Sequence, residues 1–159
     1  MSDQGTLQEV LVIGIGNEYR SDDGIGLVVA RKIRERSIAS VVVKEESGEG
    51  ASLMEAWQGY ESIILIDAVS SGKTPGTIVK IDAREKKVPA NFFFHSTHAF
   101  SIAEAIELAR AMKTLPPRLF VYGIEGKNFS SGIQVSRPVQ KSVEQVVEQI
   151  VHEIGTRTQ

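Results

Sequence analysis

The 159-residue sequence predicts a three-layer α/β/α sandwich around a mostly parallel, roughly five-stranded twisted sheet with one antiparallel strand. Two observations predict this α/β fold. Short apolar runs alternate along the chain with longer segments in which apolar residues recur at helical spacing. The runs at 10–15 (VLVIGI) and 62–67 (SIILID) are continuously apolar, which is typical of parallel strands covered on both faces. We expect residues 1–159 to form one domain with frayed ends at 1–8 and 155–159.

The first half of the chain supplies three strands and two helices. A strand at 10–15 is followed by a polar turn and then by a helix with apolar residues at positions 25, 28, 29 and 33. A second strand at 41–43 precedes a short helix that includes 53–57, and the third strand is 62–67. The order of these elements predicts parallel neighbouring strands that are connected by helices.

The second half completes the alternation. Segment 76–82 (GTIVKID) alternates between apolar and polar residues, as an edge or antiparallel strand does. A helix at 101–112 ends before Pro116 and Pro117, and the last strand is 118–125 (RLFVYGIE). A C-terminal helix carries an apolar stripe from Val143 to Ile154 that is typical of a core-facing helix.

Composition excludes several classes of function. Twenty acidic and 18 basic residues leave a net charge of −2, so we expect no nucleic-acid or membrane partner. The absence of cysteine excludes disulfides, thiolate metal sites and a cysteine nucleophile. No apolar run approaches 18 residues, and residues 1–5 lack the basic and apolar regions of a signal peptide. We therefore expect a cytoplasmic protein.

Candidate site residues lie where the strands end, because the functional site of such sheets lies beyond the carboxyl ends of the strands. The loop after the first strand reads GIGNEYRSDDGIG, and its glycines allow a partner to approach closely. We expect a substrate-binding backbone loop here, made by Gly14, Gly16, Asn17 and Gly24. Two acids, Asp22 and Asp23, lie in the same loop. Asp67 ends the third strand, and His98 precedes the helix at 101–112.

Each of these signals has an ordinary structural interpretation. Asp22 and Asp23 match an N-cap with first-turn dipole compensation, although a cap needs only one carboxylate. Asp67 also suits a turn, and a histidine in a loop is more often not a ligand. Dinucleotide binding is disfavoured because the third glycine of GxGxxG falls at Tyr19.

Taken together, two carboxylates and an imidazole form an O,O,N set that suits a divalent ion such as zinc or nickel. Three protein ligands leave positions open for water or substrate. An aspartic dyad of Asp23 and Asp67 sharing one proton stays open as an alternative, although the flanking motifs of such proteases are missing. HExxH and GxSxG motifs are absent.

In its motifs and their order, the sequence resembles the hydrogenase maturation endopeptidases. These enzymes remove a C-terminal peptide from the large subunit of nickel–iron hydrogenases. The strongest match is VIGIGN at 12–17 followed by SDDGIG at 21–26. Further matches follow in the same order along almost the whole chain, at 47–50 (SGEG), 64–69 (ILIDAV), 96–101 (STHAFS) and 122–125 (YGIE).

The resemblance implies that Asp23, Asp67 and His98 are metal ligands and catalytic residues. It also implies that nickel is delivered by the substrate, with zinc or cadmium as possible substitutes in vitro. The implied partner is the C-terminal region of the hydrogenase large-subunit precursor. We expect the protein itself to be a monomer. The chain departs from the family where Glu18 and Tyr19 replace an apolar pair, and His95 adds a second imidazole.

Two other functions remain open at this stage. The first is a metal-sensing assembly chaperone on the same fold, which docks the precursor without cutting it. The second is a metal-dependent hydrolase of small amides. The sequence leaves the roles of His95 and Glu125 undefined.

Overall fold

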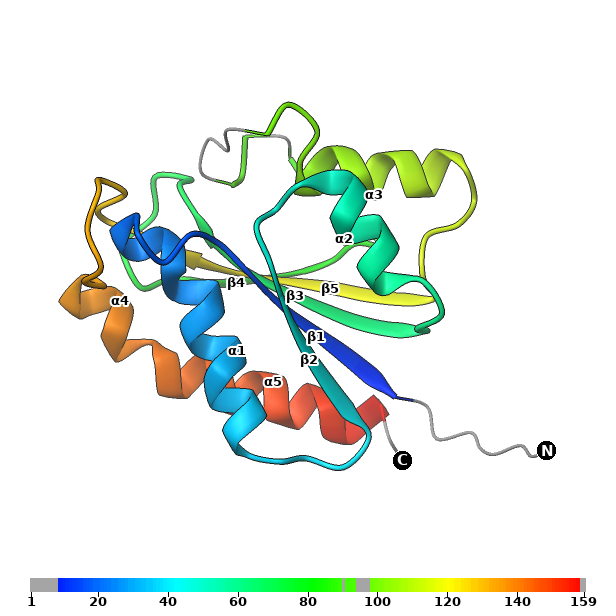
Figure 1. The fold of residues 1–159 in the computed structure, drawn as a ribbon, viewed down its shortest axis with the longest axis horizontal. Coiled ribbons are helices and arrows are strands. Elements are labelled where there is room, and N and C mark those ends of the chain that lie inside the picture. Colours follow the sequence, from blue (N-terminus) through cyan, green and yellow to red (C-terminus); the bar gives the residue numbers. More distant parts are fainter. Residues whose placement is uncertain (1–8, 90, 94–97, 158–159) are drawn as a thin grey trace.

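The computed structural model describes residues 9–89, 91–93 and 98–157, and it contains one five-stranded sheet (Figure 1). The strand order is β2-β1-β3-β5-β4. Neighbouring strands are parallel throughout, except that β4 pairs antiparallel with β5 at the edge. The strands are β1 (Val10–Ile15), β2 (Val41–Glu46), β3 (Ser62–Val69), β4 (Ile78–Asp82) and β5 (Arg118–Glu125). This confirms the predicted mostly parallel sheet with one antiparallel edge strand.

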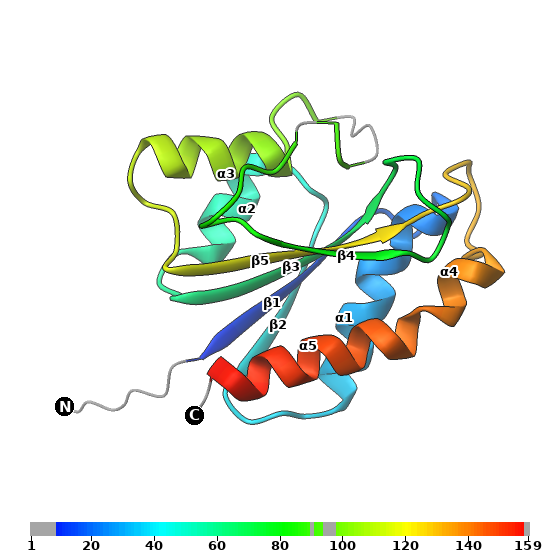
Figure 2. The ribbon, with the colours of Figure 1, turned by 180° about the vertical axis from the view of Figure 1, so that it is seen from behind.

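Helices cover both faces of the sheet, as the three-layer prediction requires (Figures 1 and 2). Apolar residues of α2 (Gly50–Trp57) and α3 (Ile102–Ala111) pack in one core cluster, on one face of the sheet. Those of α1 (Ile25–Glu35), α4 (Arg137–Lys141) and α5 (Val143–Arg157) pack in a second cluster, on the other face. A 3-10 helix, η1 (Ser21–Gly24), leads directly into α1.

The alternation of side chains along β3 fixes the direction in which Asp67 points. Ile63 and Leu65 belong to the core under α2 and α3, whereas Ile64 and Ile66 belong to the core under α1 and α5. Because the side-chain period of a strand is two residues, Asp67 shares the α2/α3 face with Ile63 and Leu65. The carboxylate therefore lies at the end of a buried strand, under the two helices.

The structure differs from the sequence prediction mainly at element ends and in one short helix. Strand β3 continues to Val69, because Val69 pairs with Glu125 of β5. Strand β4 starts at Ile78 rather than at position 76. Helix α4 was not predicted, since five residues are too few for a helical period. Its local start signal is a serine at the N-cap, Ser136, followed by a proline in the first turn.

Two glycines allow α1 to lie unusually close to the sheet. A Cβ atom on Gly26 would lie 2.3 Å from the carbonyl oxygen of Ile66 and 2.5 Å from that of Ile15. On the strand side, a Cβ atom on Gly14 would lie 2.5 Å from the Cβ of Ala30 and 2.5 Å from the carbonyl oxygen of Gly26. The first turn of α1 thus rests directly on the backbones of β1 and β3. Any larger residue at either position has to push the helix away.

We expect Gly26→Ala to destabilise the protein by about 3 kcal/mol or more, because the added methyl group meets rigid backbone atoms. Gly155→Ala, in α5, is the matched control. Its Cβ atom would meet nothing within 4 Å, so it should raise stability by about 0.5–1 kcal/mol through helix propensity. Urea unfolding followed by circular dichroism measures both changes. Equal effects of the two substitutions would contradict the close-packing argument.

Candidate functional site

A cavity of about 410 Å³ lies at the carboxyl ends of β1 and β3. Asp23, Asp67 and His98 all line it, together with Gly16 and Asn17 of the loop after β1. Its apolar lining comes from Ile15, Leu27, Phe93 and Ile102. Gly14 and Gly24 do not line this cavity; Gly14 instead supports the packing of α1 on the sheet.

The backbone of the first loop folds back on itself to present Asp23. Gly16 adopts a φ of +152°, and a Cβ atom there would lie only 2.0 Å from the carbonyl oxygen of Asp23. The N–H group of Asn17 donates to the Asp23 carboxylate at 3.1 Å. Glycine at position 16 is therefore required for Asp23 to reach the cavity.

The two cavity carboxylates are both held in surroundings that disfavour their charge. Burial raises the pKa of Asp23, although the hydrogen bond from Asn17 and the charge of Arg20 oppose this shift. Burial and the nearby charge of Asp23 raise the pKa of Asp67 well above its ordinary value, and the N–H group of Ala68 partly opposes them. Two close, desolvated carboxylates favour either a shared proton or a bound cation.

His98 enters the cavity from the segment that precedes α3. The N–H group of Gly50 donates to the carbonyl oxygen of Phe100 at 2.8 Å, and a Cβ atom on Gly50 would lie 2.4 Å from the Phe100 ring. These contacts hold the segment at 98–100 against the start of α2. Hydrogen bonds from Ser52 and Ala51 lower the pKa of Glu49, and attraction to His98 adds to this effect. His95 lies outside the described residues.

The metal site remains a prediction. Among the residues that the structure describes, no group of three or more histidine, aspartate or glutamate side chains is arranged to hold an ion. The cavity is nevertheless lined by two carboxylates and one imidazole, those of Asp23, Asp67 and His98. Nickel and zinc both accept ligands of these types.

The interpretation of Asp22 and Asp23 as N-caps is wrong, although both acids do lie in the first turn of η1. The N-cap of α1 is Gly24, and no side chain makes a capping hydrogen bond there. Asp22 is fully buried and instead accepts four hydrogen bonds from a distant loop. The donors are the N–H groups of Lys127, Asn128 and Ser136 and the hydroxyl group of Ser136, at 2.6–2.9 Å. Burial alone raises the pKa of Asp22, but these hydrogen bonds together lower it.

Glu125, at the end of β5, has a similar structural role. Its buried carboxylate accepts from the N–H and hydroxyl groups of Ser71 and from the N–H group of Gly72. The loop that follows β3 is thereby fixed against the end of β5. Sequence reasoning gave Glu125 no role, because its partners lie more than 50 residues away.

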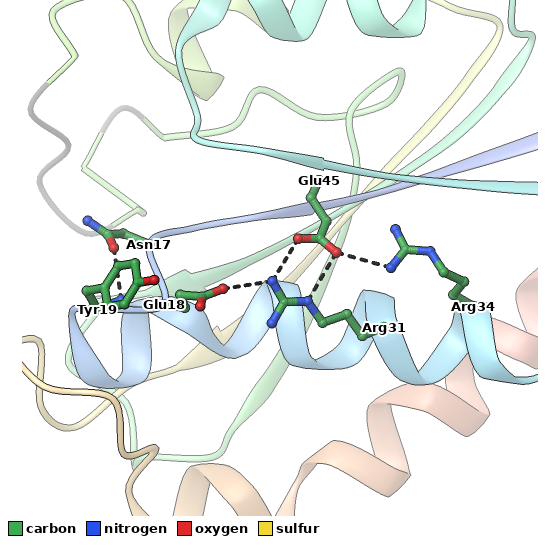
Figure 3. A network of polar contacts seen from close by, with 6 residues as sticks. All are labelled: Asn17, Glu18, Tyr19, Arg31, Arg34 and Glu45. Atoms are coloured by element: carbon green, nitrogen blue, oxygen red, sulfur yellow. Dashed lines mark hydrogen bonds and ion pairs between the residues drawn. The ribbon is translucent and has the colours of Figure 1, made fainter.

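An ionic network on the surface holds the loop that follows β1 (Figure 3). Arg31 of α1 donates to Glu18 at 2.8 Å and to both carboxylate oxygens of Glu45 at 2.8 and 3.1 Å. Arg34 also donates to Glu45, at 3.1 Å. Since Glu18 lines the cavity, this network connects the cavity rim to the solvent face of α1.

Comparison with known proteins decides the family. The profile of the hydrogenase maturation protease family matches residues 27–153. The chain belongs to the hydrogenase maturation protease family. This confirms the resemblance inferred from the sequence motifs and makes the protein a hydrolase by family. Asp67 and His98 lie inside the matched range, and Asp23 lies just before it.

Individual relatives and a solved structure agree with this assignment. The hydrogenase expression/formation protein HupD of Rhodobacter capsulatus is 31% identical over 74% of this chain, which spans 57% of HupD. The hydrogenase 2 maturation protease of Escherichia coli is 27% identical, over 85% of this chain and 84% of its own length. The structure of the hydrogenase maturating endopeptidase HybD from E. coli superposes with a TM-score of 0.80. That comparison covers 94% of this chain and 93% of HybD at 22% identity, and it shows the fold.

We expect Asp22→Asn to destabilise the protein by about 2–4 kcal/mol, because the new amide group would face N–H donors with its own N–H₂. Asp23→Asn is the matched control next to it. Since burial already disfavours the charge of Asp23, that change should leave stability unaltered or higher. Denaturant midpoints of the two variants measure the contrast, and a large loss for Asp23→Asn would favour a structural role for both acids.

The raised pKa of Asp67 predicts a pH-dependent stability. A carboxyl group with a higher pKa in the folded protein favours folding below its unfolded pKa. That contribution is lost as the pH rises through the folded-state pKa. Asp67→Asn should therefore raise stability at neutral pH and bring no gain near pH 3, where Asp67 is protonated in both states. Thermal unfolding at the two pH values checks this, and an equal gain at both would contradict it.

Proposed function

We propose that this protein is an endopeptidase that removes a C-terminal peptide from the nickel-loaded large subunit of a nickel–iron hydrogenase. The observation that carries the proposal is one cavity lined by Asp23, Asp67 and His98 in a chain of the maturation protease family. In this proposal the enzyme acts as a monomer in the cytoplasm, and its partner is the C-terminal region of the precursor.

The two carboxylates in the cavity support the proposal that the substrate carries a cationic group. Burial raises the pKa of both Asp23 and Asp67, and the charge of Asp23 adds to the shift at Asp67. A divalent ion that arrives with the precursor would relieve this repulsion. In the proposal Asp23, Asp67 and His98 contact the ion, which can polarise or position a carbonyl oxygen.

The ligand atoms available in the cavity support the proposal that nickel arrives as part of the substrate and is not a resident cofactor. The chain has no cysteine, so it lacks the thiolates that bind nickel and zinc tightly. Two carboxylates and one imidazole bind a free ion more weakly. A site of this kind suits recognition of an ion that is already held by the precursor, because it would not remove the ion from stronger ligands.

We expect release of the C-terminal peptide from nickel-loaded precursor and not from metal-free precursor. The assay mixes the protein with each form of the precursor and measures the released peptide by mass spectrometry. His98→Ala should abolish release, because it removes the only nitrogen donor among the three proposed ligands. His152→Ala is the matched control, since His152 is exposed on α5 and should leave release unchanged.

Three outcomes would change the proposal. Equal cutting of metal-free and loaded precursor in the presence of a chelator would favour an acid–base peptidase that uses Asp23 and Asp67. Binding of the precursor without any change in its length would favour the assembly chaperone. Turnover of short peptides without a folded partner would favour a general amide hydrolase.

A further inference from the structure

Large apolar side chains are exposed at two separate places in the described part of the chain. Tyr19 and Ile133 are 66% and 76% exposed. Tyr19 lines the cavity, and Ile133 follows Gly132, whose backbone is hydrogen-bonded to that of Tyr19. Leu108 and Met112 are 41% and 58% exposed, and they lie four residues apart at the end of α3. The first pair differs from the second because Tyr19 itself lines the cavity, whereas neither Leu108 nor Met112 does.

Tyr19 and Ile133 belong to two loops that are bonded directly to one another. The N–H group of Gly132 donates to the carbonyl oxygen of Tyr19 at 2.9 Å, and the N–H group of Ser21 donates to that of Gly132 at 2.8 Å. The hydroxyl group of Ser21 donates to the carbonyl oxygen of Ser130 at 2.8 Å. We use the name cavity rim for the two loops together: residues 17–21, of which 17–20 line the cavity, and residues 126–136, which are hydrogen-bonded to them.

Buried and exposed anchors hold the cavity rim in place. The buried carboxylate of Asp22 holds residues 127, 128 and 136 by hydrogen bonds from their N–H groups. The side chain of Asn17 accepts from the N–H group of Tyr19 at 2.9 Å, and Arg31 holds Glu18 (Figure 3). Tyr19 and Ile133 are therefore presented to solvent on a preorganised backbone, which lowers the entropic cost of binding a partner.

We propose that the cavity rim, through Tyr19 and Ile133, is the surface on which the folded body of the precursor docks. This inference rests on the proposed function. The occupant is an apolar surface of the precursor next to its C-terminal segment. Tyr19 also lines the cavity, so a chain that enters the cavity passes directly beside the rim.

The size of the cavity supports a docking surface outside it. A specific protein complex buries about 800 Å² on each partner. A cavity of about 410 Å³ has the size of a small-molecule pocket and takes only a short segment of chain. Most of the contact area must then come from the surface that surrounds the cavity. Tyrosine and other large apolar side chains at such a surface commonly supply much of the binding energy.

The test compares two double variants by the dissociation constant of the complex with nickel-loaded precursor. Tyr19→Ser combined with Ile133→Ser should weaken binding about tenfold or more. Leu108→Ser combined with Met112→Ser removes a similar exposed apolar area on α3 and should leave binding unchanged. All four side chains are exposed, so both variants should keep the thermal midpoint of the wild-type protein.

The outcomes separate this inference from the proposed function. Equal effects of the two double variants, or no effect of either, would overturn docking on the cavity rim. If the wild-type protein binds the precursor without cutting it, the protease proposal fails, and a selective loss in the rim variant still supports the docking surface. If the wild-type protein neither binds nor cuts the precursor, both proposals are overturned.

Discussion

The close approach of α1 to the sheet is the constraint on which the site depends. Gly14 and Gly26 let the first turn of α1 touch the backbones of β1 and β3. The loop between β1 and α1 therefore has to turn back sharply, and Gly16 provides the turn. Asp23 reaches the cavity only because these three glycines lack side chains. The position of Asp23 in the candidate site is thus a consequence of how closely the backbone packs.

Two adjacent aspartates illustrate how burial has opposite consequences when hydrogen bonding differs. Asp22 is fully buried but accepts four hydrogen bonds, so its charge is stabilised and it joins distant loops. Asp23 accepts one hydrogen bond from Asn17 and lies near the charge of Asp67. The first acid is bound within the structure, and the second is left available to a ligand. A buried charge costs little only when its hydrogen-bonding capacity is filled.

Much of the fold could be predicted from local patterns. The apolar runs at β1 and β3 are long and continuous, and the α5 stripe is regular, so their identity follows from periodicity alone. The rule that sites lie beyond strand ends pointed to Asp23, Asp67 and His98, and all three line one cavity. The roles of Asp22 and Glu125 could not be predicted in this way. Their partners lie 53 to 114 residues away in the sequence, and no local signal links them.

The cavity rim has two kinds of anchor, and they differ in their response to ionic strength. The pairs of Arg31 with Glu18 and Glu45 are partly exposed, so dissolved ions weaken them once the Debye length falls to about 3 Å, near 1 M salt. The hydrogen bonds to Asp22 are buried and largely escape this screening. Concentrated salt should therefore release the Glu18 side of the rim while the Asp22 side stays in place. The salt concentration can therefore change how firmly the loop beside Asp23 is held, while the fold stays the same.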